Sequence, residues 1–526
     1  DMSTTKNVKW AVKLGSQSYG NPTVSGGRVY VGTNNDFEDD PRFPGDFSLL
    51  VCFDEQTGEK LWKLTVPKMG SGKVGDWEYL GICSSPSIDG DRVYVVTNRC
   101  DVLCLDVNGL ANGNDGAFQD EAQYFAGPGE PKVELTPTDA DILWRYDMGD
   151  DLGVFPHNIT SSAPLVYGDK VWVCTSNGVD WSHKNVPNPL APSFVCLDKM
   201  TGALAGEEDE HVSEGILPGG WSSSAAAESD GQKIVFYSGP DGMLYAFSGT
   251  EFGKDPDGFI LFKTIWKFDG NPPSYRWRVE DPEWVQDGPG QFHVKNDTFK
   301  LDARGERIPI KYVKPEGPSE FIATPVIYKD RVYAAIGQDP EHGEGMGNLV
   351  CVDLKTGEQV WHYPLINRAI STCAILDDKV YVGDYNGYMY CFDANNGALQ
   401  WRHDTQSHIW GSPLVADGKL WIGNEDGILT VMHLDAYNAM AAATEGPVYT
   451  RVKSRRVEID GERVKQFYLE HVDKDENEKQ IEEAEMKKLV QEIEMPGPVY
   501  SSPIVANGVL YVGTHTHLYA VAQPKE

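Results

Sequence analysis

Short segments of alternating apolar and polar residues recur along the chain. Each group of them ends in an Asp, a Thr-Gly or Asn-Gly turn, and a Trp, with clear copies at 29–62, 332–361 and 380–401. Alternation with a period of two predicts half-buried strands, and turns rich in Gly and Asp predict hairpins. Four short strands repeated every roughly 40–50 residues are typical of a β-propeller, whose blades bury their faces against one another.

A run of small residues marks the inner strand of each predicted unit. The runs begin at residues 20, 84, 161, 222, 323, 371, 411 and 501. Small side chains suit the crowded centre of a radial array, so the runs predict an all-β, eight-bladed propeller. The last unit lacks an outer strand, whereas the chain opens with a lone strand that carries Trp10. We therefore expect residues 7–14 to complete the blade at 500–522 and to close the ring, which removes open sheet edges.

Residues 1–526 are predicted to form one propeller with three insertions, at 108–141, 269–321 and 445–488. The last insertion alternates around an Ile-Asp-Gly-Glu turn, which predicts a hairpin, and its charge spacing over 475–491 predicts an exposed helix. A solvated decoration and a docking arm for a partner both fit this insertion. By strand order, the insertion at 269–321 opens on the same mouth of the channel as most long loops, and the other two open on the opposite face.

Charge and apolar run length exclude several classes of function. Lys and Arg number 46 against 79 Asp and Glu, a net charge of -33, which repels nucleic acid and anionic lipid. No apolar run is long enough to span a membrane. The chain begins with Asp1, which suggests that a leader has been removed and predicts a periplasmic or extracellular location.

Five of the nine cysteines occupy one buried strand position. A disulfide between Cys83 and either Cys100 or Cys104 is an open alternative.

The Asp-x-x-Thr-Gly-x-x-x-Trp phrase, at Asp54 to Trp62 and Asp353 to Trp361, resembles the repeat of the pyrroloquinoline quinone-like eight-bladed propellers. That superfamily contains quinoprotein alcohol dehydrogenases and an outer-membrane-assembly propeller lipoprotein. The stretches at 21–35, 176–194 and 337–345 are similar to secreted propellers of planctomycete-type bacteria. The resemblance implies the propeller fold over nearly the whole chain. Its dehydrogenase members hold their quinone under an adjacent Cys-Cys disulfide, and because no two cysteines are adjacent here, we expect no tightly bound quinone.

Candidate binding residues lie in loops at the predicted mouth. His157 and Asn158 belong to the loop that enters the third unit, and Trp221 and Trp410 directly precede two of the small-residue runs. Planar ligands stack on tryptophan rings, so these four residues are candidates for contact with a ligand, although propeller tryptophans more often serve in packing.

One acidic loop is a candidate metal site. Within GQDPEHGEG, the possible ligands are Asp339, Glu341, His342 and Glu344. Carboxylates close together on a turn supply the hard oxygen ligands that calcium prefers, but acidic loops are common in a chain this acidic. An ordinary surface loop is the alternative.

Two functions remain open at this point. The first is a secreted or periplasmic scaffold, without quinone, whose loop-rich face binds an envelope protein or a small-molecule or glycan ligand. The second is a quinone- or metal-dependent dehydrogenase that oxidises alcohols or sugars. No catalytic residue is identified by the sequence.

Overall fold

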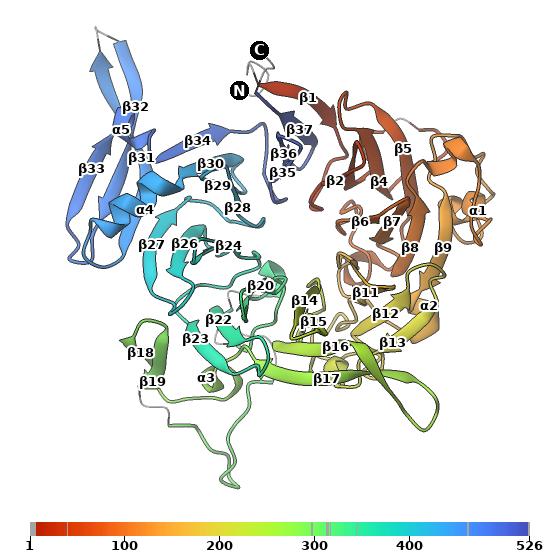
Figure 1. Ribbon diagram of the computed structural model, residues 1–526, viewed down its shortest axis with the longest axis horizontal. Helices are drawn as coiled ribbons and strands as arrows, with labels where there is room; N and C mark the ends of the chain where they lie inside the picture. Colours follow the sequence, from red (N-terminus) through yellow and green to blue (C-terminus); the bar gives the residue numbers. More distant parts are fainter. Residues whose placement is uncertain are drawn as a thin grey trace.

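The protein is all-β and propeller-like, with its sheets arranged radially around a centre (Figure 1). The computed structural model describes residues 7–38, 40–295, 298–311, 315, 317–342, 345–459 and 462–523. Within these residues, each repeated unit contributes a run of four strands, and the alternating side chains bury their apolar members between neighbouring units.

Five sheets contain four strands each. The first comprises β2 (Thr23–Ser25), β3 (Arg28–Asn34), β4 (Phe47–Asp54) and β5 (Lys60–Pro67). The second comprises β6 (Ser87–Asp89), β7 (Arg92–Val96), β8 (Asp101–Asp106) and β9 (Ile142–Asp147). The third comprises β20 (Val326–Tyr328), β21 (Arg331–Ile336), β22 (Asn348–Asp353) and β23 (Gln359–Tyr363). The fourth comprises β28 (Leu414–Ala416), β29 (Lys419–Gly423), β30 (Ile428–His433) and β34 (Val490–Glu494). The fifth comprises β35 (Ile504–Ala506), β36 (Val509–Gly513), β37 (His517–Val521) and β1 (Val8–Lys13).

Two larger sheets differ from the prediction of eight separate blades. In the eight-stranded sheet, β10 (Leu165–Tyr167), β11 (Lys170–Cys174), β12 (Phe194–Asp198) and β13 (Leu204–Glu207) meet β14 (Ala225–Ser229), β15 (Gln232–Ser238), β16 (Met243–Lys254) and β17 (Ile260–Asp269). The two halves join where β13 pairs in parallel with β17 at Glu207 and Leu261. The outer strand β17 is ten residues long and reaches the short outer strand β13, so the edges of the two units merge.

The seven-stranded sheet carries part of the last insertion. It comprises β24 (Ala374–Leu376), β25 (Lys379–Gly383), β26 (Tyr388–Asp393), β27 (Leu399–Asp404), β31 (Val448–Ile459), β32 (Glu462–Val472) and β33 (Glu478–Glu482). The expected hairpin is present as β31 and β32, but the expected helix over 475–491 is wrong. That segment forms β33, the four-residue helix α5 (Glu483–Met486) and the start of β34. Glu482 pairs across strands with Arg455, which favours a strand there, whereas the helical spacing of Glu483 and Lys487 is used only around α5.

The predicted closure of the propeller is confirmed. β1 pairs antiparallel with β37, and Trp10 lies opposite Ala520 in the ladder. Strands β1 and β37 lie side by side in Figure 1. A second contact joins the last unit to the first, because the backbone N–H of Ser502 donates to Asn21 Oδ1 at 2.7 Å.

The repeat tryptophans dock each unit onto the next. Trp361 is fully buried, and its Nε1–H donates to the carbonyl of Ala394 at 2.9 Å in the following unit. Its ring lies against Gly397, where a Cβ atom would approach the indole to 2.7 Å, so this turn requires glycine. The same arrangement recurs for Trp10, Trp62, Trp144 and Trp266, whose indoles donate to the carbonyls of Glu55, Val107, Lys199 and Leu354.

The insertions cover outer strands of the propeller. The segment at 108–141, which includes helix α1 (Glu121–Ala126), lies along β5, where the backbone of Lys63 bonds both Thr138 and Ala140. Although its chain enters from the face opposite the long loops, α1 lies at the outer rim in Figure 1. The hairpin of β18 (Glu283–Gly288) and β19 (Gln291–Lys295) in 269–321 also lies at the rim, where Gly290 accepts from His362 N at 3.1 Å beside β23. The prediction that this insertion crowds the mouth is therefore wrong for its hairpin, which instead covers an open edge.

Three further α-helices lie within the described residues. They are α2 (Met148–Leu152), α3 (Pro273–Arg276) and α4 (Leu434–Ala442). Helix α4 takes the place of the usual Thr-Gly turn in its unit, and Asn438 accepts the indole N–H of Trp401 at 2.9 Å.

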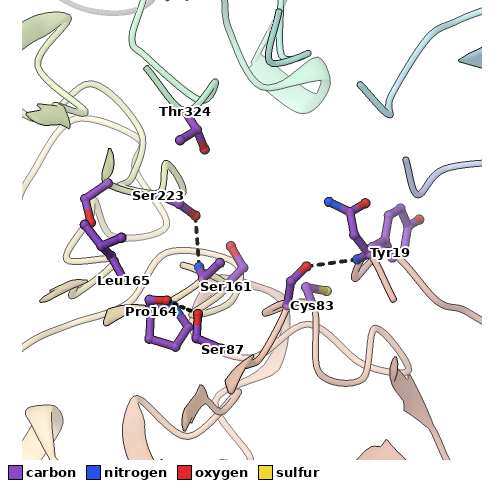
Figure 2. A pocket seen from close by; sticks show the side chains of 12 residues that line it. Tyr19, Cys83, Ser87, Ser161, Pro164, Leu165, Ser223 and Thr324 are labelled. Carbon is purple, nitrogen blue, oxygen red and sulfur yellow. Dashed lines mark hydrogen bonds between the residues drawn. The ribbon is translucent and has the colours of Figure 1, made fainter. Parts of the chain in front are cut away.

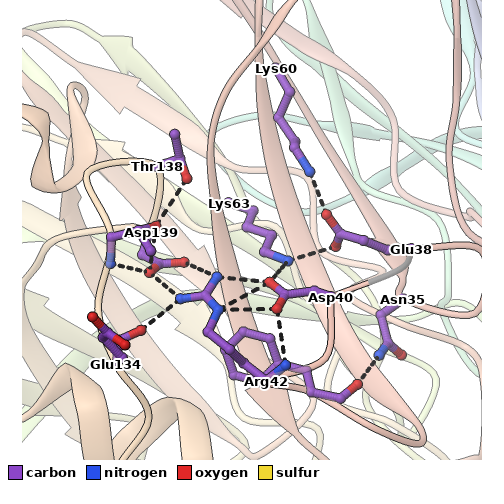
Figure 3. Close-up of polar contacts among 11 residues, drawn as sticks. Asn35, Glu38, Asp40, Arg42, Lys60, Lys63, Glu134, Thr138 and Asp139 are labelled. Carbon is purple, nitrogen blue, oxygen red and sulfur yellow. Dashed lines mark hydrogen bonds and ion pairs between the residues drawn. The ribbon is translucent and has the colours of Figure 1, made fainter.

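An ion-pair network fastens the loop after β3 to the insertion at 108–141 (Figure 3). Arg42 pairs with Asp40 and with the fully buried Asp139, both at 2.7 Å. Lys63, also buried, pairs with Asp40 and Glu38 at 2.8 Å. Three basic and three acidic side chains, counting Lys60, balance one another, so the network fixes the loop without leaving a charge unpaired.

Candidate functional site

The inner strands are linked around the axis by a relay of hydrogen bonds. In each link, a backbone N–H of one small-residue run donates to the side-chain oxygen of the next run. Six such links, from 2.7 to 3.0 Å, start at Asn21, Ala163, Thr324, Thr372, Ser412 and Ser502. Two links are absent from the described residues. The link from Ser85 is missing because its acceptor position holds Ala163, which has no hydroxyl, and the link from Ser223 to Thr324 is missing as well.

A cavity opens beside the incomplete part of this relay (Figure 2). It has a volume of about 420 Å³. Its lining consists of Tyr19, Asn21, Cys83, Ser85, Ser87, Ser161, Ala163, Pro164, Leu165, Ser223, Ser224 and Thr324. These are hydroxyl, amide and small apolar groups without a charged side chain. The cavity can therefore donate and accept hydrogen bonds but cannot neutralise an anion.

His157 and Trp221 lie together among the loops that enter the third and fourth units. The indole N–H of Trp221 donates to the carbonyl of His157 at 3.0 Å, and the two rings are 6.0 Å apart. His157 is fully buried, and its Nδ1 lies 2.7 Å from the carbonyl of Val179. The backbone of Asn158 bonds Val74 and Trp77 of the preceding loop at 2.6 and 2.8 Å. In this arrangement His157 and Asn158 hold the mouth loops together, and the half-buried Trp221 lies over them.

Trp410 belongs to a different cluster, built from four units. Its ring centroid lies 5.3 Å from Tyr385, 5.5 Å from Tyr500 and 6.1 Å from Tyr19. Its indole N–H donates to Glu425 Oε2 at 3.2 Å. Burial, followed by the neighbouring Tyr500, raises the pKa of Tyr19 well above its ordinary value, so this phenol stays neutral. Tyr19 and Tyr500 stand directly before small-residue runs, as Trp221 and Trp410 do. This shared position in the sequence could have identified Tyr19 and Tyr500 as members of the aromatic cluster.

The acidic loop is described only in part. Glu344 and the side chain of His342 lie outside the described residues. Asp339 accepts from the backbone N–H of Glu341 at 2.8 Å, at the start of the short 3-10 helix η5 (Pro340–His342). Within the described part of the chain, no group of three or more His, Cys, Asp or Glu side chains is placed to hold a metal ion.

Glu320 is a residue at this site that the sequence did not reveal. It is fully buried, its Oε1 lies 3.4 Å from the backbone N of Asp339, and its Oε2 has no hydrogen-bond partner. Burial and, next, the charge of Asp339 raise the pKa of Glu320, so this carboxyl holds its proton more tightly than an exposed glutamate does. Its burial depends on contacts between distant loops, which no local pattern encodes.

The axial cavity does not fit pyrroloquinoline quinone. The quinone is planar and carries three carboxylates, whereas the cavity lining carries no cationic side chain. The nine cysteines are all free thiols, so the disulfide that covers the quinone in the dehydrogenases has no counterpart.

Large apolar side chains are exposed on the loops of the first three units. They are Phe37, Met69, Tyr79, Trp181, Leu190 and Met200. The first five lie in loops that enter an inner strand or connect the second strand to the third, and these loops open on one face, whereas Met200 lies on the β12–β13 turn of the opposite face. The loops contact one another: the backbone N–H of Tyr79 donates to Asp46 Oδ2 at 2.7 Å, and Phe155 N donates to Asn177 Oδ1 at 2.9 Å. We call this surface the loop-rich face.

A sequence model of the family described as outer membrane protein assembly factor BamB matches residues 3–184 and 345–441, which is more than half of the chain. The chain belongs to this family. BamB from Moraxella catarrhalis is 12% identical, with 99% of this chain and 98% of that chain covered and a TM-score of 0.50. A europium-containing methanol dehydrogenase is also 12% identical, with 98% and 93% covered and a TM-score of 0.51.

The match to the family model confirms the predicted pyrroloquinoline quinone-like propeller family. The two solved structures, at 12% identity, show the fold alone. No curated protein matches the sequence. Among the described residues there is no helix long and apolar enough to cross a membrane.

Proposed function

We propose that the protein is an eight-bladed scaffold of the bacterial envelope, in the periplasm or outside the cell, that binds a protein partner through its loop-rich face. The eight runs of four strands support the blade count, with two blades merged at β13 and β17. The family supports the envelope setting and a role in assembly. The single domain 1–526, with insertions at 108–141, 269–321 and 445–488, belongs to the same proposal.

The observation that carries this proposal is the exposed apolar surface of the loop-rich face. Trp181 is 66% exposed and Leu190 is 79% exposed, on one loop between β11 and β12. Large apolar side chains gathered on one face of a soluble protein are typical of protein interaction sites. The net charge of -33 keeps such a surface from associating with other copies of the chain.

The other candidate residues take supporting places in this proposal. Trp221 and Trp410 supply half-buried aromatic surface at the mouth, while His157 and Asn158 fix the loops that surround it. Calcium binding at Asp339, Glu341, His342 and Glu344 stays a prediction, which calorimetric titration with calcium would test. The alternative dehydrogenase activity has support from fold similarity only, and the cavity chemistry disfavours the quinone.

The test compares two variants for binding to purified outer-membrane assembly proteins from the organism that encodes the chain. The double variant Trp181→Ala/Leu190→Ala removes the most exposed apolar groups of the loop-rich face. The control Met200→Ala removes a side chain that is 53% exposed on the β12–β13 turn, which opens on the opposite face. We expect the double variant to weaken binding at least roughly tenfold and the control to leave it unchanged. Equal affinities of both variants and the wild type would contradict the proposal.

A further inference from the structure

The hairpin of the last insertion extends beyond the sheet that anchors it. β31 pairs in parallel with β27 only from Val448 to Arg451, and then continues to Ile459 with β32 as its one partner in the ladder. β33 joins the other edge of β32 only from Tyr468 onward. Residues 452–459 and 462–467 therefore form a two-stranded ribbon, which projects from the ring at the upper left of Figure 1. We call this ribbon the arm.

The arm leaves open edges, whereas several outer strands of the ring are covered. The outer strands β5, β23 and β27 are each covered by an insertion, and β1 closes the ring. Along the arm, by contrast, the described residues show no ladder on the outer side of β31 after Arg451. A two-stranded ribbon is marginally stable by itself, and its free N–H and C=O groups are a template for another strand.

The arm is also basic in a strongly acidic chain. Between residues 451 and 468 there are six Lys or Arg against three Asp or Glu, whereas the whole chain has a net charge of -33. Near the base, these charges are paired within the insertion: Arg451 and Lys453 with Glu470. Arg455 pairs across the sheet with Glu482. Farther along the arm, the described side chains form no ion pair.

Two positive charges face each other where the pairing stops. Arg456 lies directly opposite Lys465 in the ladder, on the same face as the buried pair Val452 and Leu469 at the base. Both Arg456 and Lys465 are exposed, and among the described residues neither forms an ion pair. Like charges directly opposite each other destabilise a hairpin, and a carboxylate placed beside them relieves that repulsion.

We propose that an extended, acidic segment of a partner protein adds to the open edge of β31 as a further strand. The carbonyl of Val452 already accepts from Gln406 Nε2 at 2.8 Å, so main-chain hydrogen bonds to residues 453–459 supply the affinity. Carboxylates on the added strand pair with Arg456, close to the positive charge of Lys465. A second copy of this chain is a poor occupant, because pairing two arms edge to edge brings their basic residues together. This surface lies away from the loop-rich face, so the inference stands apart from the proposed function.

The experiment uses the full chain and a fluorescent ten-residue peptide in which Glu alternates with Val and Thr. Two matched peptides serve as controls, one with Lys in place of Glu and one with the same side chains but N-methylated at alternate backbone nitrogens. Binding is measured by anisotropy, and amide hydrogen exchange is measured across residues 448–472. The protein variants are Arg456→Glu/Lys465→Glu and, as a control, Lys300→Glu, which changes an exposed lysine in another insertion.

We expect the acidic peptide to bind, to slow exchange of the amides between Val452 and Val457, and to lose roughly tenfold in affinity with the double variant but not with Lys300→Glu. The lysine peptide and the N-methylated peptide should both fail to bind. Equal binding of the N-methylated peptide would show simple charge attraction and would overturn strand addition. Failure of the acidic peptide to bind would also overturn the proposal. Binding to vesicles of phosphatidylglycerol is measured in parallel, and if only the vesicles bind the arm, the proposal is overturned as well.

Discussion

Replacing Trp10 by alanine tests whether the N-terminal strand holds the propeller closed. Trp10 is 8% exposed, its ring lies 5.9 Å from that of Tyr511, and Gly58 of the first unit leaves the space that the indole occupies. Its Nε1–H donates to the carbonyl of Glu55 at 3.0 Å. The substitution removes both the packing and the hydrogen bond between the last blade and the first.

The structure sets the size of the expected loss. Truncating a buried Trp to Ala costs about 3–5 kcal/mol, from lost burial and the cavity that remains. The lost hydrogen bond adds at most about 1 kcal/mol, because the Glu55 carbonyl also accepts from Lys9 Nζ at 3.2 Å and is not left without a donor. We expect the free energy of unfolding to fall by about 4 kcal/mol.

Urea unfolding followed by circular dichroism measures this loss against two matched variants. Trp361→Ala removes an indole docked in the same way between two blades in mid-chain, and it should cost a similar amount. Trp181→Ala removes an exposed indole and should change stability by less than about 0.5 kcal/mol. Only Trp10→Ala should also make the N-terminal residues sensitive to protease, since β1 is the strand it releases. If Trp10→Ala proves as stable as Trp181→Ala, the closing role of β1 is refuted.

Three further outcomes are expected. Burial raises the pKa of Asp241 to about 7, so the native state keeps a proton that the unfolded chain releases above about pH 4. This carboxyl therefore lowers the free energy of unfolding as pH rises from about 4 to 7. In urea titrations Asp241→Asn should remove this part of the pH dependence, and an unchanged pH dependence would contradict it. Burial raises the pKa of Cys83 to about 12, and the other thiols are buried and free. The nine cysteines should therefore react with Ellman's reagent only after unfolding. Seven reactive thiols in the unfolded protein would reveal a disulfide. Arg42→Met leaves the buried Asp139 without its guanidinium partner and should lower the free energy of unfolding by about 3–5 kcal/mol. Lys295→Met, in an exposed pair with Glu283, should lower it by less than about 1 kcal/mol. Equal losses would show that the buried network stabilises the fold no more than a surface ion pair does.

The repeat made most of the fold predictable from the sequence. Strand alternation, turn residues and the spacing of Trp62 and Trp361 are local patterns, and the unmatched strand with Trp10 was enough to predict closure. The merging of two sheets at Glu207 and Leu261 was not predictable, because it depends on how far the long strand β17 reaches across to a neighbour. The segment 475–491 was misassigned because opposite charges four residues apart, such as Glu483 and Lys487, suit a helix. Glu482 in the same segment instead pairs across strands with Arg455.

The candidate site was predictable only where a residue type stood at a repeated position. Trp221 and Trp410 were found before small-residue runs, but Tyr19 and Tyr500 at the same position were missed. The sequence also did not indicate that His157 is buried, or that Glu320 lies beside Asp339, because both facts depend on loops brought together from different units. Whether these mouth residues bind a ligand stays a prediction.

Site-specific photo-crosslinking tests the central claim most directly. A photoreactive phenylalanine analogue would replace Trp181, Leu190 or, as the control on the opposite face, Met200 in the full-length protein, expressed in its own organism. Each position is more than half exposed, so the label reports proximity without disturbing the core. We expect crosslinks from positions 181 and 190 to one outer-membrane assembly protein, identified by mass spectrometry, and none to that protein from position 200. Crosslinks to it from position 200 alone, or from none of the three positions, would contradict binding through the loop-rich face.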